Sequence, residues 1–156
     1  MTAESASSPN SVNLCCMNVL FLCAGNSARS LIAEAVLNRR GAGRFAAFSA
    51  GSRPRGEPHP VALETLERAG FATRALRSKS WDEFSGDAAI ELDIVITLCD
   101  SAAAEVCPVW AGAPRMVHWG LPDPAAVTEP GACRTAFAKT LGEIERRIAA
   151  FMHELP

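Results

Sequence analysis

A short, almost continuous apolar run opens the part of the chain that has regular patterning. Residues 17–23 have the sequence Met-Asn-Val-Leu-Phe-Leu-Cys, and such a run is typical of a central parallel strand that is covered on both faces. Residues 28–40 follow with apolar side chains one helical turn apart, from Leu31 to Val36, and Gly41 is placed to end a helix. The run is therefore predicted to be the first strand of a strand, loop and helix unit.

The alternation of strand and helix continues to the end of the chain. Further strands are predicted over residues 44–50, 92–98 and 115–119, and further helices over residues 60–69 and 134–154. Short alternating units favour one α/β domain with a parallel sheet, whose ligand sites lie beyond the carboxyl ends of the strands. Cys23, Cys99 and Trp119 are placed at such ends.

Length and charge narrow the range of functions. The chain has 156 residues, which suits one domain. Residues 1–15 are predicted to be a disordered leader without a signal peptide or membrane anchor, and residues 16–156 to be a cytoplasmic domain. Because its 15 basic and 17 acidic residues are interspersed, a small soluble partner is expected, not nucleic acid or a membrane. In a reducing compartment, the six cysteines are expected to be catalytic or redox-active.

The loop after the first predicted strand has the ingredients of an oxyanion site. It consists of Cys23, Ala24, Gly25, Asn26, Ser27, Ala28 and Arg29, with Ser30 after it. Backbone N–H groups and the dipole of the following helix would surround a tetrahedral anion, and Arg29 adds a bidentate fork. The same field would favour the thiolate form of Cys23, with Ser30 as its hydrogen-bond partner, so Cys23 is predicted to be a nucleophile.

Two residues of this loop suit a sharply turned backbone. Gly25 permits a tight or left-handed turn, and Asn26 tolerates such geometry and can brace the loop through its amide. The loop lacks the Gly-Lys-Ser/Thr end of a Walker sequence and the glycine spacing of a dinucleotide fingerprint. A nucleotide is therefore not the expected ligand.

The same residues carry a resemblance to a known family. The segment from Val19 to Glu34 resembles the low-molecular-weight protein tyrosine phosphatases and the arsenate reductases built on the same fold. The Ser49-Ala50-Gly51 turn and the loop with Gly56, Pro58 and Pro60 are also similar, so the similarity runs from about residue 17 to the end. The resemblance implies a four-stranded parallel sheet in the order 2-1-3-4, flanked by helices, and an acidic Asp from a late loop.

Asp123, within Trp119-Gly-Leu-Pro-Asp-Pro-Ala125, matches that loop. The resemblance implies that it protonates an oxygen leaving the central atom of the substrate. In the phosphatases, aromatic residues usually follow this Asp-Pro pair and hold the substrate ring, whereas this chain continues with Ala125-Ala126 and contains no Tyr. Aryl phosphate is therefore predicted to be a poor substrate.

The segment from Cys99 to Pro108 resembles the redox segment of arsenate reductases. A thiolate adduct of arsenate can be reduced when a second thiol attacks the arsenylated sulfur and a third receives the disulfide. Cys23, Cys99 and Cys107 are predicted to be attacker, resolver and relay in that order. A short helix after Cys99 would have to loosen for that relay. In the alternative reading, Cys99 only fills the core and Cys107 is incidental.

No cofactor or metal is expected. Some reductases of the family bind potassium through positions that match Asn26, Glu34 and Ser49, but the fourth ligand position, an Asp, is here Trp81, with Lys79 nearby, which disfavours that site. Thioredoxin is the expected electron donor, with glutaredoxin and glutathione as the alternative. Cys15 and Cys16, which precede the first strand, have no predicted role.

Three functions remain open, in a definite order. The first is reduction of arsenate to arsenite, as in arsenical resistance and detoxification. The second is a low-molecular-weight phosphotyrosine phosphatase, which would use Cys23, Arg29 and Asp123 but has no use for a resolving pair. The third is a non-catalytic module that binds an oxyanion or arsenite. Phosphate and sulfate are expected to mimic arsenate in the loop.

Overall fold

The computed structural model describes residues 16–86, 89–104 and 108–155. The predicted leader and the predicted relay cysteine, Cys107, lie outside the described residues. Four parallel strands form one sheet in the order β3-β2-β4-β5, which is 2-1-3-4 along the chain and confirms the expected topology. Their bounds are β2 Met17–Leu22, β3 Phe45–Ala50, β4 Ile94–Thr97 and β5 Arg115–His118.

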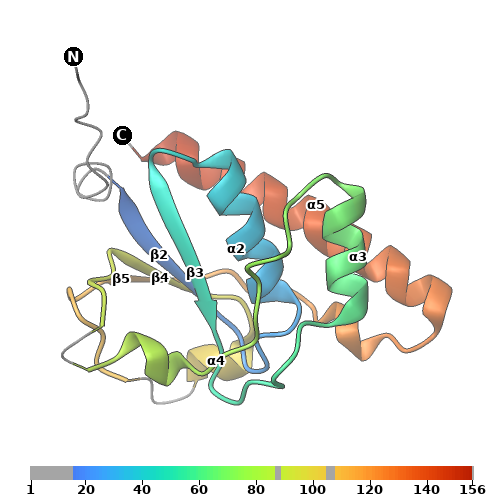
Figure 1. Cartoon of the computed structure of the whole chain (residues 1–156), viewed down its shortest axis with the longest axis horizontal. Helices are drawn as coiled ribbons and strands as arrows, with labels where there is room; N and C mark the ends of the chain where they lie inside the picture. The colour runs from blue at the N-terminus through green and yellow to red at the C-terminus, as the bar shows by residue number, and fades with distance from the viewer. Residues whose placement is uncertain (1–15, 87–88, 105–107, 156) are drawn as a thin grey trace.

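Three helices cover one face of this sheet (Figure 1). They are α2 (Arg29–Arg40), α3 (Pro60–Arg68) and α5 (Pro130–Glu154). The remaining helical elements are short, namely α4 (Asp100–Ala104) and the two 3-10 helices η1 (Trp81–Phe84) and η2 (Pro124–Ala126). Within the described residues, no helix combines the length and apolar character that crossing a bilayer requires.

Alternate side chains of β2 enter two separate apolar clusters. Val19 and Phe21 pack on the side of α2, α3 and α5, whereas Leu20 and Leu22 pack on the opposite side with Phe84 of η1. These four of the six residues of β2 are at most 1% exposed. The continuous apolar run in the sequence thus reflects a central strand that is buried on both faces.

Helix α5 begins earlier than its apolar pattern predicts, at Pro130 instead of Arg134. Proline suits the first position of a helix, and the side chain of Glu129 caps the helix by accepting from the N–H of Ala132 at 2.6 Å. The periodic pattern indicates only where a helix packs against the core. The short helices η1 and η2 were not predicted, because a single 3-10 turn leaves no periodicity in the sequence.

The central strand leads directly into the loop with the candidate nucleophile. Residues 23–28 connect the carboxyl end of β2 to the start of α2. Strands β3 and β4 lie on either side of β2, so residues that follow all three strands meet at one edge of the sheet. This edge is where parallel α/β folds bind their ligands.

Candidate active site

The loop between β2 and α2 presents an uncapped helix N-terminus. Helix α2 begins at Arg29, and the side chain of its N-cap residue, Ala28, makes no hydrogen bond to the first turn, which holds no acidic residue. The first N–H groups of a helix have no partner within the helix, and the helix dipole places partial positive charge there. An oxyanion in the loop would therefore meet donors that the helix itself does not use.

The backbone turns at Asn26, whose φ of 45° is left-handed and whose side chain is fully buried. Gly25 is not in the left-handed region; its missing Cβ instead leaves room for Arg55, whose Nε would lie 3.1 Å from such an atom. Gly51 is needed because a Cβ there would lie 2.5 Å from the carbonyl oxygen of Ala24. The turn after β3 therefore packs directly against the loop.

Three hydrogen bonds in sequence, the first two with a fixed direction, end at the sulfur of Cys23. The backbone N–H of Lys79 donates to Oδ1 of Asn26 at 2.8 Å, which leaves Nδ2 of Asn26 to donate to Oγ of Ser30 at 2.7 Å. Oγ of Ser30 lies 2.9 Å from Sγ of Cys23. Because Oγ of Ser30 accepts from Asn26, its own hydrogen is available to the sulfur. A donated hydrogen bond favours the thiolate over the thiol.

Arg29 is oriented by the loop that carries Asp123. Its Nη1 donates to the carbonyl oxygen of Leu121 at 2.8 Å, and its Nη2 lies 3.9 Å from Oδ2 of Asp123. Its Nε is buried and has no hydrogen-bond acceptor among the described residues. A buried N–H without an acceptor costs free energy, which an oxyanion in the loop would offset.

Asp123 lies at the start of η2, where its Oδ1 accepts from the N–H of Ala125 at 2.9 Å. Its side chain is 37% exposed. The carboxyl group is thus oriented by the backbone, lies on the side of Arg29 and is open to solvent. This placement suits an acid that exchanges protons with water and with a bound anion.

Cys99 follows the strand next to β2. The N–H of Leu98 donates to the carbonyl oxygen of Leu22 at 2.8 Å, so Cys23 and Cys99 each follow a residue of one hydrogen-bonded pair. Both cysteines are buried, with exposed fractions of 3% and 6%. The N–H of Ala102 donates to Sγ of Cys99 at 3.4 Å, so the thiol takes part in the first turn of α4. The fold therefore places Cys23 and Cys99, two of the three predicted redox cysteines, at the ends of adjacent strands.

The start of α4 is tied to β5 through His118. Its Nε2 lies 3.0 Å from Oδ1 of Asp100, and its Nδ1 lies 2.7 Å from Oγ1 of Thr97. These contacts would have to adjust if the segment after Cys99 rearranged. The predicted partner of that rearrangement, Cys107, is outside the part of the chain that the structure describes.

Three polar side chains from different elements meet next to the loop. Nζ of Lys79 lies 3.8 Å from Oε1 of Glu34 and 3.4 Å from Oγ of Ser49, which in turn donates to the same Glu34 oxygen at 2.5 Å. Burial raises the pKa of Glu34, an effect that Ser49 and Lys79 partly offset. Burial likewise lowers the pKa of Lys79, partly offset by Glu34. The carboxylate of Glu34 and the ammonium of Lys79 are thus both buried at a place that disfavours their charged forms.

This cluster does not fit the potassium site that some reductases of the family have and that Trp81 disfavours here. Glu34 and Ser49 are in contact, as that site would require, but the ammonium of Lys79 already interacts with both. Trp81 offers no ligand oxygen in its side chain, and its ring instead packs edge-on against Trp110 with centroids 6.3 Å apart. A lysine therefore supplies the positive charge at this place.

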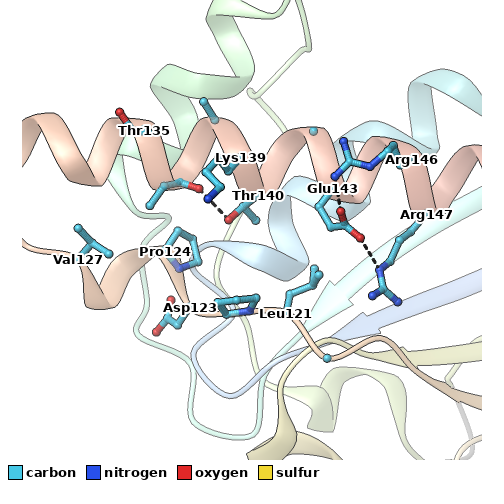
Figure 2. A pocket seen from close by; sticks show the side chains of 15 residues that line it. Leu121, Asp123, Pro124, Val127, Thr135, Lys139, Thr140, Glu143, Arg146 and Arg147 are labelled. Carbon is cyan, nitrogen blue, oxygen red and sulfur yellow. Dashed lines mark hydrogen bonds and ion pairs between the residues drawn. The ribbon is translucent and has the colours of Figure 1, made fainter.

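A groove of about 860 Å³ lies beside the site, between the Asp-Pro loop and α5. Figure 2 shows Leu121 and Asp123 on one wall and Lys139 and Glu143 of α5 on the other. Neither the nucleophile candidate nor Arg29 lines this groove. Asp123 is thus the link between the groove and the anion loop.

Three contacts that hold the site were not predicted from the sequence. They are the carbonyl of Leu121 on Arg29, the N–H of Lys79 on Asn26 and the approach of Arg55 to Gly25. The first two depend on backbone groups, which carry no signal in residue type. Lys79 stands between two serines in a stretch without periodicity, so only its unusual burial, at 9% exposed, distinguishes it.

Comparison with known proteins gives a consistent result over most of the chain. Residues 18–156 match the sequence model of the family described as low molecular weight phosphotyrosine protein phosphatase. The chain is 33% identical over 133 residues to an arsenate reductase of Brevibacillus brevis, covering 85% of this chain and 92% of the relative. It is 29% identical over 130 residues to a glutaredoxin arsenate reductase of Synechocystis, covering 83% and 92%.

A solved structure is similar as well. The thioredoxin-dependent arsenate reductase of Corynebacterium glutamicum superposes with a TM-score of 0.66 and 26% sequence identity. The match covers 93% of this chain and 64% of that one. The chain therefore spans slightly less than two thirds of the length of that relative.

Proposed function

The chain belongs to the low molecular weight phosphotyrosine protein phosphatase family, and we propose that it is an arsenate reductase built on that fold, which reduces arsenate to arsenite through a Cys23 thiol adduct. The observation that carries this proposal is the hydrogen bond from the N–H of Leu98 to the carbonyl oxygen of Leu22, since a buried cysteine directly follows each of these two residues at the ends of adjacent strands. A phosphatase needs the first cysteine only. A reductase needs both.

In the first step, the thiolate of Cys23 attacks the arsenic atom of arsenate, and a sulfur–arsenic bond forms. Asp123 transfers a proton to the departing oxygen, which leaves as water. Arg29 and the N–H groups of the loop bind the remaining oxygens. The hydroxyl of Ser30, at 2.9 Å from the sulfur, stabilises the thiolate before the attack.

In the second step, the thiolate of Cys99 attacks the sulfur of Cys23. The sulfur–arsenic bond breaks, and its electron pair stays on arsenic, which passes from As(V) to As(III) and leaves as arsenite. Two thiols have lost two electrons, and a Cys23 to Cys99 disulfide has formed. The two cysteines start from adjacent strand ends, so this step requires local movement only.

In the third step, Cys107 attacks the sulfur of Cys99 and releases the thiolate of Cys23. The new disulfide is then reduced by a cellular dithiol, for which thioredoxin is the first candidate. The similar proteins named above include one thioredoxin-dependent enzyme and one glutaredoxin enzyme, so both donors enter the test. Both are kept reduced in the cytoplasm, where we propose that the enzyme works.

Hydrolysis of phosphate esters is the second candidate function. The placement of Asp123 on the side of Arg29 favours it, because the same nucleophile, cation and acid suffice for phosphoryl transfer to water. The residues after the Asp-Pro pair are Ala125 and Ala126, which offer an aryl ring little to pack against. We therefore place arsenate first.

The test compares donors and substrates with one preparation. Oxidation of NADPH is followed with arsenate, thioredoxin and its reductase, in parallel with glutathione, glutaredoxin and glutathione reductase. Hydrolysis of an aryl phosphate is measured separately. Arsenate-dependent NADPH oxidation with one donor supports the proposal. Hydrolysis alone would indicate a phosphatase, and tight oxyanion binding without either activity would indicate a binding module.

A further inference from the structure

The buried cluster of Glu34, Ser49 and Lys79 is outside the catalytic set, yet it is joined to it. Lys79 is 9% exposed and Ser49 is fully buried, and the side chain of Glu34 is 13% exposed. Taking an ammonium and a carboxylate out of water costs more free energy than their attraction commonly returns. The fold therefore holds a costly ion pair directly beside the anion loop.

Lys79 is fixed at both its side chain and its backbone. Its Nζ donates to the carbonyl oxygen of Arg77 at 2.8 Å and lies close to Glu34 and Ser49. Its carbonyl oxygen accepts from the N–H of Gly51 at 2.9 Å. With both ends held, the N–H of Lys79 points at Oδ1 of Asn26.

That N–H determines how the amide of Asn26 is turned, and so which of its groups faces Ser30. A backbone N–H can only donate, so Asn26 presents its oxygen to Lys79 and its amide hydrogens to Ser30. Ser30 then has its hydroxyl hydrogen available for the sulfur of Cys23. If Lys79 moved, the amide of Asn26 could rotate and present its oxygen to Ser30, whose hydroxyl hydrogen would then be drawn away from the sulfur.

We propose that Lys79 is a positioning residue, whose buried ammonium serves as an internal cation that keeps the Asn26 to Ser30 to Cys23 hydrogen bonds directed toward the thiolate. The inference rests on the proposed role of Cys23 as nucleophile. It also explains why the cluster does not fit a potassium ion: the charge that an ion would bring is already carried by the chain.

The oxygen atoms around the ammonium of Lys79 indicate what kind of site its removal would create. A carboxylate oxygen of Glu34, the hydroxyl of Ser49 and the carbonyl of Arg77 all lie around Nζ. Oxygen atoms of these kinds bind hard cations. Truncation of Lys79 to Ala therefore leaves room and free ligands for a monovalent cation, whereas in the wild type the ammonium fills that space and already engages these oxygens.

The first experiment measures how fast iodoacetamide alkylates Cys23 across pH, read by peptide mass spectrometry. Lys79→Met is compared with the wild type and with Lys139→Met, a matched control at the exposed lysine of α5. At about pH 6, alkylation of Cys23 should be roughly tenfold slower in Lys79→Met and unchanged in Lys139→Met. With arsenate, kcat should fall more than KM rises. A Lys79→Met profile that coincides with the wild-type profile overturns the proposal.

The second experiment compares potassium chloride with choline chloride at about 0.1 M. Potassium should speed the alkylation of Cys23 in Lys79→Ala and leave the wild type unchanged. Stimulation of the wild type, or equal rates for Lys79→Ala in both salts, contradicts the internal cation, and this comparison holds even if Lys79→Met does not fold. If wild-type Cys23 reacts no faster than the other cysteines, the proposed function fails instead.

Discussion

Cys23 and Cys99 follow the two residues of one hydrogen-bonded pair, since the N–H of Leu98 donates to the carbonyl oxygen of Leu22 at 2.8 Å. The sheet therefore places the residues that precede the two cysteines next to each other. Adjacent parallel strands keep this relation rigid, while α4, of only five residues, can rearrange beyond it. The proposed relay would use both features, since the paired strands would hold the two cysteines close and the short helix could move with Cys99.

The first prediction concerns the reactivity of Cys23. At about pH 6, iodoacetamide should modify Cys23 before the other cysteines, because loop N–H groups, Arg29 and Ser30 stabilise its thiolate. Phosphate or arsenate should slow this modification by occupying the loop. Peptide mass spectrometry with and without oxyanion provides the measurement. Equal labelling of all six cysteines, with no protection by either anion, would remove Cys23 as the nucleophile.

The second prediction concerns Asp123. Hydrolysis of an aryl phosphate should be slow in the wild type, and Asp123→Asn should lower it by roughly 10²-fold or more, since the amide cannot supply the proton. Asp82→Asn, at an exposed residue of η1, is a suitable control and should retain the wild-type rate. An Asp123→Asn variant with full activity would show that the leaving oxygen needs no acid from this loop.

The third prediction uses the raised pKa of Glu34. A carboxyl group whose pKa is raised on folding binds more protons in the folded state, so its contribution to stability is lost as the pH rises through that pKa. Glutamine does not titrate, so Glu34→Gln does not lose stability in this way as the pH rises. As the pH rises above about 4.5, the ordinary pKa of a glutamate, the free energy of unfolding of Glu34→Gln should therefore increase relative to that of the wild type, whatever its absolute value. Denaturant unfolding at several pH values checks the slope.

A paired comparison tests the same cluster at neutral pH. Lys79→Met should lower the free energy of unfolding by about 3 kcal/mol, because it leaves the carboxylate of Glu34 buried without a counter-ion. The double variant Glu34→Gln with Lys79→Met should regain most of that loss, since no charge remains to be desolvated. Additive losses in the double variant would mean that the two residues do not act as a pair.

Much of the fold and part of the site follow from the sequence in physical terms. The apolar run before Cys23 predicted a central strand because burial on both faces leaves no place for alternating polar residues. The loop residues from Cys23 to Arg29 predicted an anion site because glycine, asparagine and arginine each supply what a backbone nest requires. The sheet order and the acid Asp123 came from resemblance to a family, and the observed topology agrees.

Other features have no signature in the residue types. The carbonyl of Leu121 on Arg29 and the N–H of Lys79 on Asn26 are backbone groups, so any residue could supply them. The left-handed position falls on Asn26 and not on Gly25, because the glycine is needed where Arg55 passes close to the loop. Which of the two residues takes the left-handed conformation, and which lacks a Cβ, therefore depends on tertiary contacts that the local sequence does not reveal.

The fourth prediction separates the two later cysteines by the stage at which each variant stops. Cys99→Ser should give at most one turnover and no disulfide to Cys23, because nothing attacks the arsenylated sulfur. Cys107→Ser should release arsenite once and then fail to cycle with thioredoxin. Both variants should retain whatever aryl phosphatase activity the wild type has, which serves as the internal control for folding. Normal cycling of Cys107→Ser with glutaredoxin and glutathione would keep the arsenate chemistry but remove the relay.

The most direct test of the account is a map of disulfides after a single arsenate turnover without any reductant. Fully reduced protein is mixed with arsenate, quenched with acid, alkylated and digested, and cysteine-containing peptides are identified by mass spectrometry. The account predicts a Cys99 to Cys107 disulfide in the wild type, a Cys23 to Cys99 disulfide in Cys107→Ser, and one arsenite released per disulfide. Arsenite formed while Cys99 remains a free thiol would contradict it.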